Sequence, residues 1–140
     1  MAILGGVALP SFVSWRTNMY YKQAAGDVVN ALKTARSKAI SRNQEHGVIF
    51  TTADRSYQFK RYSTNQWVNF GSKAYLSNQV TLNLNSAAAS AVAPEPNIRF
   101  GINGASSVYA NYSVRIKDTT SSKYVIAVEP SGRITSRRVP

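Results

Sequence analysis

The residue types that most often perform acid–base or metal chemistry are scarce in this 140-residue chain. It has one histidine, His46, six acidic residues and no cysteine. Without cysteine, disulfide bonds, thiolate metal sites and thiol catalysis are excluded. The acids Asp54, Glu95, Asp118 and Glu129 fall in or beside expected turns, which such residues favour. No carboxylate pair or His/Asp/Glu group has the spacing of an acid–base or metal site. We therefore expect no catalytic residue, no metal, no cofactor and no enzymatic activity.

His46 falls at the expected end of a long helix. A positive charge there complements the helix dipole. We therefore interpret this histidine as a surface residue.

Basic residues dominate the charge of the chain. Seventeen Lys and Arg against six Asp and Glu give a net charge of +11 at pH 7. Such a charge suits an anionic partner, which could be nucleic acid, a lipid surface or acidic patches on a neighbouring subunit. The basic residues are scattered rather than clustered, so a surface that is merely solubilising is an open alternative.

The C-terminal residues form a second candidate for chemistry. Arg133, Arg137 and Arg138 lie near the end of the chain, and Lys117 and Lys123 precede them. Guanidinium groups can clamp phosphates, with an affinity that falls steeply as salt rises. These five residues are the candidate DNA-binding residues, and a solvated tail is the alternative.

The first fifteen residues, Met1–Trp15, carry no charge and form a candidate assembly helix. The apolar stretch spans about twelve residues, whereas a membrane-spanning helix needs roughly 20. So early in the chain these side chains have no partner sheet, and we expect them to bury against lipid or neighbouring helices. An ordinary core helix is the alternative, and a kink is expected at the proline. The candidate assembly residues are Ile3, Leu4, Val7, Leu9, Pro10, Phe12 and Val13.

Helical periodicity follows the apolar stretch, and we expect one helix from about Pro10 to Asn43, with room for a further turn before Pro10. Small and apolar residues recur at helical spacing, which predicts one buried face. The members of that face are Ala24, Val28, Ala31, Leu32, Ala35 and Ala39.

Alternating and β-branched segments fill the chain after Gly47, and no second helix is expected. One long helix followed by strands favours an α+β fold in which the helix packs on antiparallel sheet. The sequence divides into an assembly or anchor helix, residues 1–46 (apolar 1–15, amphipathic 16–43), and a β-rich head, residues 47–140. Residues 85–96 are expected to be a surface loop. The expected strands are Val48–Thr52, Tyr57–Tyr62, Trp67–Phe70, Val80–Leu84, Ile98–Phe100, Tyr112–Lys117, Tyr124–Val128 and Arg133–Thr135.

Several of these segments together resemble type IV pilin-like proteins, most closely the GspH/FimT group of pseudopilins and minor pilins. Ala2–Phe12 is similar to the second half of the pilin N-terminal helix, proline included. Leu32–Asn43 is similar to the end of that helix in the group. Ile98–Gly104 resembles a strand and turn of the group, and Ser131–Ile134 resembles its closing Gly-Arg strand. The resemblance spans nearly the whole chain.

The resemblance implies a pilin-like fold and a structural subunit of a type IV pilus or a type II secretion pseudopilus that assembles through its N-terminal helix. Its partners would be other pilin or pseudopilin subunits and the inner-membrane assembly machinery. It implies export to the inner membrane and periplasm before assembly, and then a pseudopilus or cell-surface pilus. The family has a further apolar stretch and a processing site that precede Met1, so membrane contact is expected through a segment missing here.

The resemblance also carries an alternative function, a minor pilin that binds DNA for uptake. DNA-binding members of the FimT branch have a C-terminal Gly-Arg-x-Arg-x-Arg pattern. Gly132, Arg133 and Arg137 match that pattern, but Thr135 stands in place of its middle arginine. The match is therefore partial.

Overall fold

The structure is a computed structural model that describes residues 2–89, 95–106, 112–118 and 121–139, with the backbone alone at residues 2–14, 86, 87 and 112. One long helix is followed by eight strands and one short helix. In chain order these are α1 (Ala2–Ser41), β1 (His46–Thr51), β2 (Ser56–Ser63), β3 (Gln66–Tyr75), β4 (Thr81–Leu84), α2 (Ser86–Ala89), β5 (Ile98–Phe100), β6 (Tyr112–Lys117), β7 (Ser122–Val128) and β8 (Ile134–Arg138).

Helix α1 buries the face that its periodicity predicts. All six predicted members are at most 4% exposed, and Val28, Leu32, Ala35 and Ala39 are fully buried. The helix ends where Asn43 takes a left-handed conformation with a φ of 52°, and the amide of Gln44 bonds the Ala39 carbonyl at 3.3 Å. That arrangement satisfies carbonyls of the last turn.

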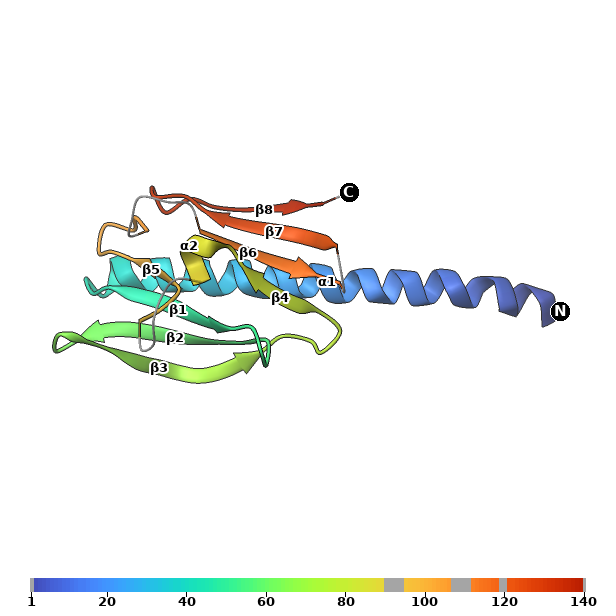
Figure 1. Cartoon of the computed structure of the whole chain (residues 1–140), viewed down its shortest axis with the longest axis horizontal. Coiled ribbons are helices and arrows are strands. Elements are labelled where there is room, and N and C mark those ends of the chain that lie inside the picture. Colours follow the sequence, from blue (N-terminus) through green and yellow to red (C-terminus); the bar gives the residue numbers. More distant parts are fainter. Residues whose placement is uncertain (1, 90–94, 107–111, 119–120, 140) are drawn as a thin grey trace.

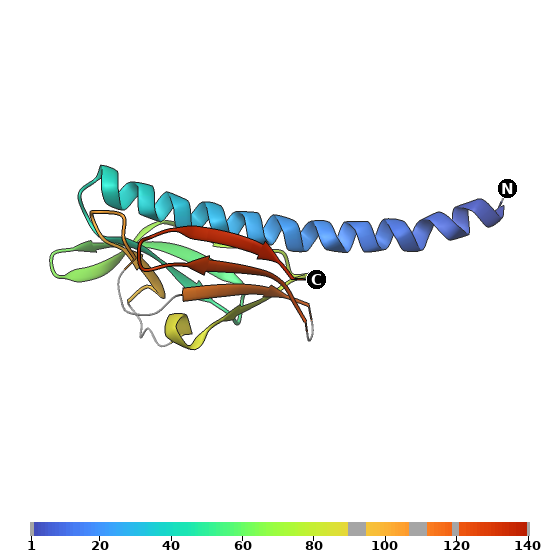
Figure 2. The same cartoon turned by 90° about the horizontal axis from the view of Figure 1, so that it is seen from above.

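The start of α1 differs from the expectation. The helix begins at Ala2 and continues through Pro10, rather than beginning near that proline. Proline removes one backbone hydrogen bond but has a helical φ. Figure 2 shows that the ribbon bends gently over its N-terminal half and is not broken there.

Two four-stranded antiparallel sheets cover one side of α1 (Figures 1 and 2). The first has the strand order β3-β2-β1-β5, and the second has the order β4-β6-β7-β8. Within the first, β1 and β2 form the predicted hairpin, with Thr51 opposite Ser56. This arrangement of one helix on antiparallel sheets confirms the predicted α+β fold.

A single hydrophobic core joins the helix to both sheets. Val48 and Phe100 of the first sheet are fully buried with Leu32 of α1, and so are Ile116 and Ile126 of the second sheet. Burying side chains of this size stabilises the fold by about 1.5–3 kcal/mol each. The alanines of α1 keep the helix narrow, which lets both sheets approach its axis.

A short second helix, α2, corrects the expectation that residues 85–96 are all loop. The side-chain Oδ1 of Asn85 accepts a 3.0 Å hydrogen bond from the amide of Ala88, as a helix N-cap does. The alanines that follow have the highest helix propensity. Residues 90–94 of the expected loop lie outside the described residues.

The chain end is a second correction. Arg137 and Arg138 belong to strand β8 and pair with Val125 and Tyr124 of β7, so they are not part of a solvated tail. The last strand therefore begins one residue later than predicted, at Ile134, and extends three residues further, to Arg138.

Candidate assembly surface

The N-terminal half of α1 extends beyond both sheets. Figures 1 and 2 show the helix continuing past the end of the head to the N-terminus. Among the described side chains of α1, Tyr21 is the first that is buried, and it is 7% exposed. All seven candidate assembly residues lie in the helical segment before that point.

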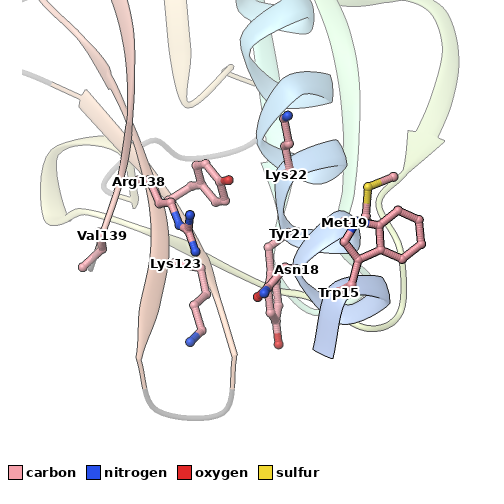
Figure 3. Close-up of a pocket in the computed structure, with 9 residues that line it drawn as sticks. Trp15, Asn18, Met19, Tyr21, Lys22, Lys123, Arg138 and Val139 are labelled. Atoms are coloured by element: carbon pink, nitrogen blue, oxygen red, sulfur yellow. The ribbon is translucent and has the colours of Figure 1, made fainter. Parts of the chain in front are cut away.

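A groove marks the place where α1 leaves the head (Figure 3). It has a volume of about 350 Å³. Trp15 and Met19 lie on its helix side and are 57% and 47% exposed. Arg138 and Val139 lie on its other side, at the end of β8. Tyr124 of β7 also lines the groove. The groove is therefore lined by apolar side chains from the helix and mostly by polar side chains from the strands.

Basic residues line this groove from both sides. Lys22 comes from α1, while Lys123 and Arg138 come from the sheet. Lys123 forms a 3.4 Å ion pair with Asp118, and both side chains are partly exposed. Exposed pairs of this kind contribute at most about 1 kcal/mol to stability. The groove therefore carries a positive charge beside an apolar surface.

The five candidate DNA-binding residues do not form one patch, although Lys123 and Arg138 line the same groove. Arg138 faces the groove, whereas Arg133 lies beside Lys33 and Arg36. These two arginines are about 16 Å apart along the strand direction. Arg137 is opposite Val125 and projects from the other face of β8, because successive residues of a strand alternate. Lys117 is opposite Ser122, at the β6–β7 turn. The geometry therefore divides these cations among separate surfaces.

His46 corrects the expectation of a surface histidine. It begins β1, is 1% exposed and packs edge-on against Phe70, with ring centres 5.7 Å apart. Its Nδ1 atom donates to the carbonyl of Gln44 at 2.8 Å, because a carbonyl can only accept. Burial, together with nearby Arg42, Lys38 and Arg61, lowers the pKa of His46, although the bond to Gln44 opposes this.

Sequence reasoning missed the groove residues Trp15, Met19 and Lys22. The spacing of Trp15 and Met19 continues the period of the buried face of the helix, so the sequence alone does not set them apart from it. Only the position of β7 and β8 reveals that the sheet ends before it reaches them. No local signal could have shown this.

No group of three or more His, Asp or Glu side chains in the described part could hold a metal ion. Within the same residues, no helix is both long and apolar enough to cross a membrane.

The overall architecture is similar to solved pilin-like structures. The minor pseudopilin EpsH of the Vibrio cholerae type II secretion system has a TM-score of 0.69 at 13% identity, covering 85% of this chain and 94% of that one. The Escherichia coli GspH solution structure has a TM-score of 0.69 at 14% identity, covering 86% and 89%. The Pseudomonas aeruginosa type IV minor pilin FimU has a TM-score of 0.65 at 16% identity, covering 83% and 91%. At these identities the likeness shows a shared fold.

Sequence comparison identifies the family. No curated protein matches this chain in sequence. The family described as "Type II transport protein GspH" matches residues 24–132, which is well over half of the chain. The match gives no support to the DNA-binding alternative. The chain belongs to the GspH family of pilin-like type II transport proteins, and it is a subunit of a pilus or pseudopilus.

Proposed function

We propose that this subunit assembles with other pilin-like subunits through the protruding half of α1, while the two-sheet head remains at the filament surface. The observation that carries the proposal is the extension of α1 beyond both sheets (Figure 1). Residues 2–15 of that extension contain no charged side chain. An uncharged helical surface without a partner in its own head favours burial against neighbouring helices.

Family membership places the protein among those exported to the cell envelope, where it assembles with other subunits. We propose the finer steps on the same basis. The subunit waits at the inner membrane and periplasm, engages the assembly machinery there, and then enters a pseudopilus or a surface pilus. DNA has no part in this proposal, because the candidate arginines point to separate surfaces.

The experiment places a charge in the protruding helix and an identical charge on the head. Ile3→Arg tests the helix, and Ile102→Arg is the matched control because Ile102 is already 52% exposed. Both variants would be expressed in cells with the native assembly system, and their incorporation into filaments measured. We expect Ile3→Arg to abolish incorporation without changing the thermal stability of the head, and Ile102→Arg to retain it. Equal incorporation of both variants would contradict the proposal.

A further inference from the structure

Three cations surround one aromatic ring near the C-terminal end of α1. Lys38 Nζ lies 4.1 Å from the centre of the Phe70 ring, Arg42 Cζ lies 5.3 Å from it and Arg61 Cζ lies 5.7 Å from it. His46 contacts the same ring edge-on. We call Lys38, Arg42, Arg61, His46 and Phe70 the cationic cluster. It combines the end of α1 with β1, β2 and β3, at the opposite end of the head from the protruding helix (Figure 1).

No acidic side chain of the chain neutralises this cluster. All six Asp and Glu residues are among the described residues. The ion pairs Lys73–Asp54 and Lys123–Asp118 of the described residues include no residue of the cluster. The positive charges near Phe70 therefore repel one another without a local counter-charge.

Two buried nitrogen atoms of the cluster lack a hydrogen-bond partner among the described residues. They are Nε2 of His46 and Nε of Arg61, which lie on opposite residues of β1 and β2. Buried polar atoms are normally hydrogen-bonded, so an unpaired one requires an explanation. Because Nδ1 of His46 donates to the Gln44 carbonyl, Nε2 is an acceptor in the neutral ring and becomes a donor only when the ring is protonated.

Packing alone accounts for part of this arrangement. Cations stack favourably on an aromatic face, and they complement the negative end of a helix dipole. Neither effect supplies a counter-charge or a partner for the two buried nitrogen atoms. An anion would supply the counter-charge, and it would accept from Nε of Arg61 and, once the ring is protonated, from Nε2 of His46.

We propose that the cationic cluster binds a carboxylate side chain of a neighbouring subunit, so that an acidic segment docks at this end of the head. The neighbour's identity as a filament subunit rests on the proposed function, whereas the carboxylate site rests on the cluster itself. Arginine binds a carboxylate through two parallel hydrogen bonds, and lysine adds a point charge.

The geometry favours one or two carboxylates over a nucleic acid. The cluster gathers its charges within about 6 Å of one ring centre. DNA presents a charge about every 1.7 Å along its axis and is bound by cations distributed along that axis. The net charge of +11 also opposes docking of a second copy of this chain and favours an acidic partner.

The single histidine makes the site directly observable. NMR would follow the His46 ring signals of the full chain during titration with a hexaglutamate peptide at low salt. We expect saturable shifts, and we expect the bound peptide to raise the pKa of His46 toward its ordinary value. The double variant Lys38→Gln/Arg42→Gln should weaken binding about tenfold or more, because charge-assisted hydrogen bonds are lost.

The matched control is Arg115→Gln/Arg137→Gln, which removes the same charge from two exposed positions. It should weaken peptide binding less than roughly threefold, because it lowers only the overall positive charge of the protein. Equal weakening by both pairs, or tighter binding of a short DNA duplex than of the peptide, would overturn the proposal. Should the first pair unfold the protein, Arg42→Gln alone keeps the test, because Arg42 is exposed.

A cellular arm separates this inference from the proposed function. Lys38→Glu/Arg42→Glu should reduce incorporation into filaments, whereas Arg115→Glu/Arg137→Glu should not. Normal incorporation of the first pair would overturn docking at the cluster. The result for Ile3→Arg tests the assembly helix and does not depend on peptide binding.

Discussion

The Nε atom of Arg36 donates a 2.9 Å hydrogen bond to the carbonyl oxygen of Gly104. Arg36 lies on α1, and Gly104 belongs to the turn that follows β5. Gly132, in the turn between β7 and β8, packs against the same carbonyl group. Helix and both sheets therefore meet at one point, where there is no room for another side chain.

Replacement of Gly132 by alanine should destabilise the protein by about 2–5 kcal/mol. Its φ is +88°, and an added Cβ would overlap the Gly104 carbonyl. The free-energy costs of backbone strain and of overpacking therefore add. Gly71→Ala is the control, because Gly71 has a φ of +77° but no atom within 4 Å of the added Cβ. It should cost only about 1–2 kcal/mol. Urea unfolding would measure both, and equal losses would contradict the packing argument.

Replacement of Gly26 by alanine should stabilise the protein by about 0.5–1 kcal/mol. Gly26 lies inside α1, and an added Cβ would meet nothing within 4 Å. Alanine reduces the entropy that the unfolded chain loses on folding. Gly47→Ala should have the opposite sign, because its Cβ would lie 2.6 Å from Cγ of Pro96. Thermal unfolding of the two variants checks the sign, and a lower midpoint for Gly26→Ala would refute this reasoning.

Replacement of Asn97 by aspartate should cost about 2–4 kcal/mol at pH 7. The buried Asn97 amide accepts from the backbone N–H of Phe50 at 2.6 Å and donates to the carbonyl of Ala88 at 2.8 Å. Aspartate loses the donor and places a charge against that carbonyl. Asn83→Asp, at an exposed position of β4, should be nearly neutral. Similar unfolding free energies for the two variants would rule out this role of Asn97.

The Asp27→Asn variant should gain stability over the native chain as pH rises. Burial raises the pKa of Asp27, so the folded state holds its proton more tightly than the unfolded state does. The native chain therefore loses stability as pH rises through values just above 3.8, whereas the asparagine variant does not. Unfolding free energies from pH 3 to pH 7 would show the difference, and a pH-independent difference would contradict it.

Asp54→Asn is the control of opposite sign. The hydroxyl of Ser56, with a smaller contribution from Lys73, lowers the pKa of Asp54. Its contribution is present at neutral pH and is lost as pH falls below about 4. The two asparagine variants should therefore diverge in opposite directions.

The features of the fold that depend on neighbouring residues in the chain could be predicted from the sequence. The buried face of α1 follows from the 3.6-residue period, and the β1–β2 hairpin follows from a polar turn between two strands. The pairing of β1 with β5 joins Val48 to Ile98, and no sequence pattern specifies such a distant partner. The cationic cluster was missed for the same reason, because Lys38, Arg61 and Phe70 come from three separate elements.

Local hydrogen bonds could likewise be predicted from the sequence, whereas hydrogen bonds between distant residues could not. The N-cap at Asn85 could have been read from the sequence, since asparagine followed by alanines is typical of a helix start. The role of Asn97 could not, because its partners at Phe50 and Ala88 approach only in the folded chain. Arg137 and Arg138 are adjacent in the sequence, but successive residues of β8 project from opposite faces, so the two arginines are separated.

The shared core of α1 has a mechanical consequence. Both sheets grip the same face of one helix, from Tyr21 to Ala39, and no described strand pairing joins one sheet to the other. A force applied along the protruding end of α1 would act in shear on the whole helix–sheet interface. It would not separate the strands one at a time. Close-packed interiors transmit such strain with little compression. Helix α1 would therefore transmit a pulling force through the subunit, and both sheets would resist it together.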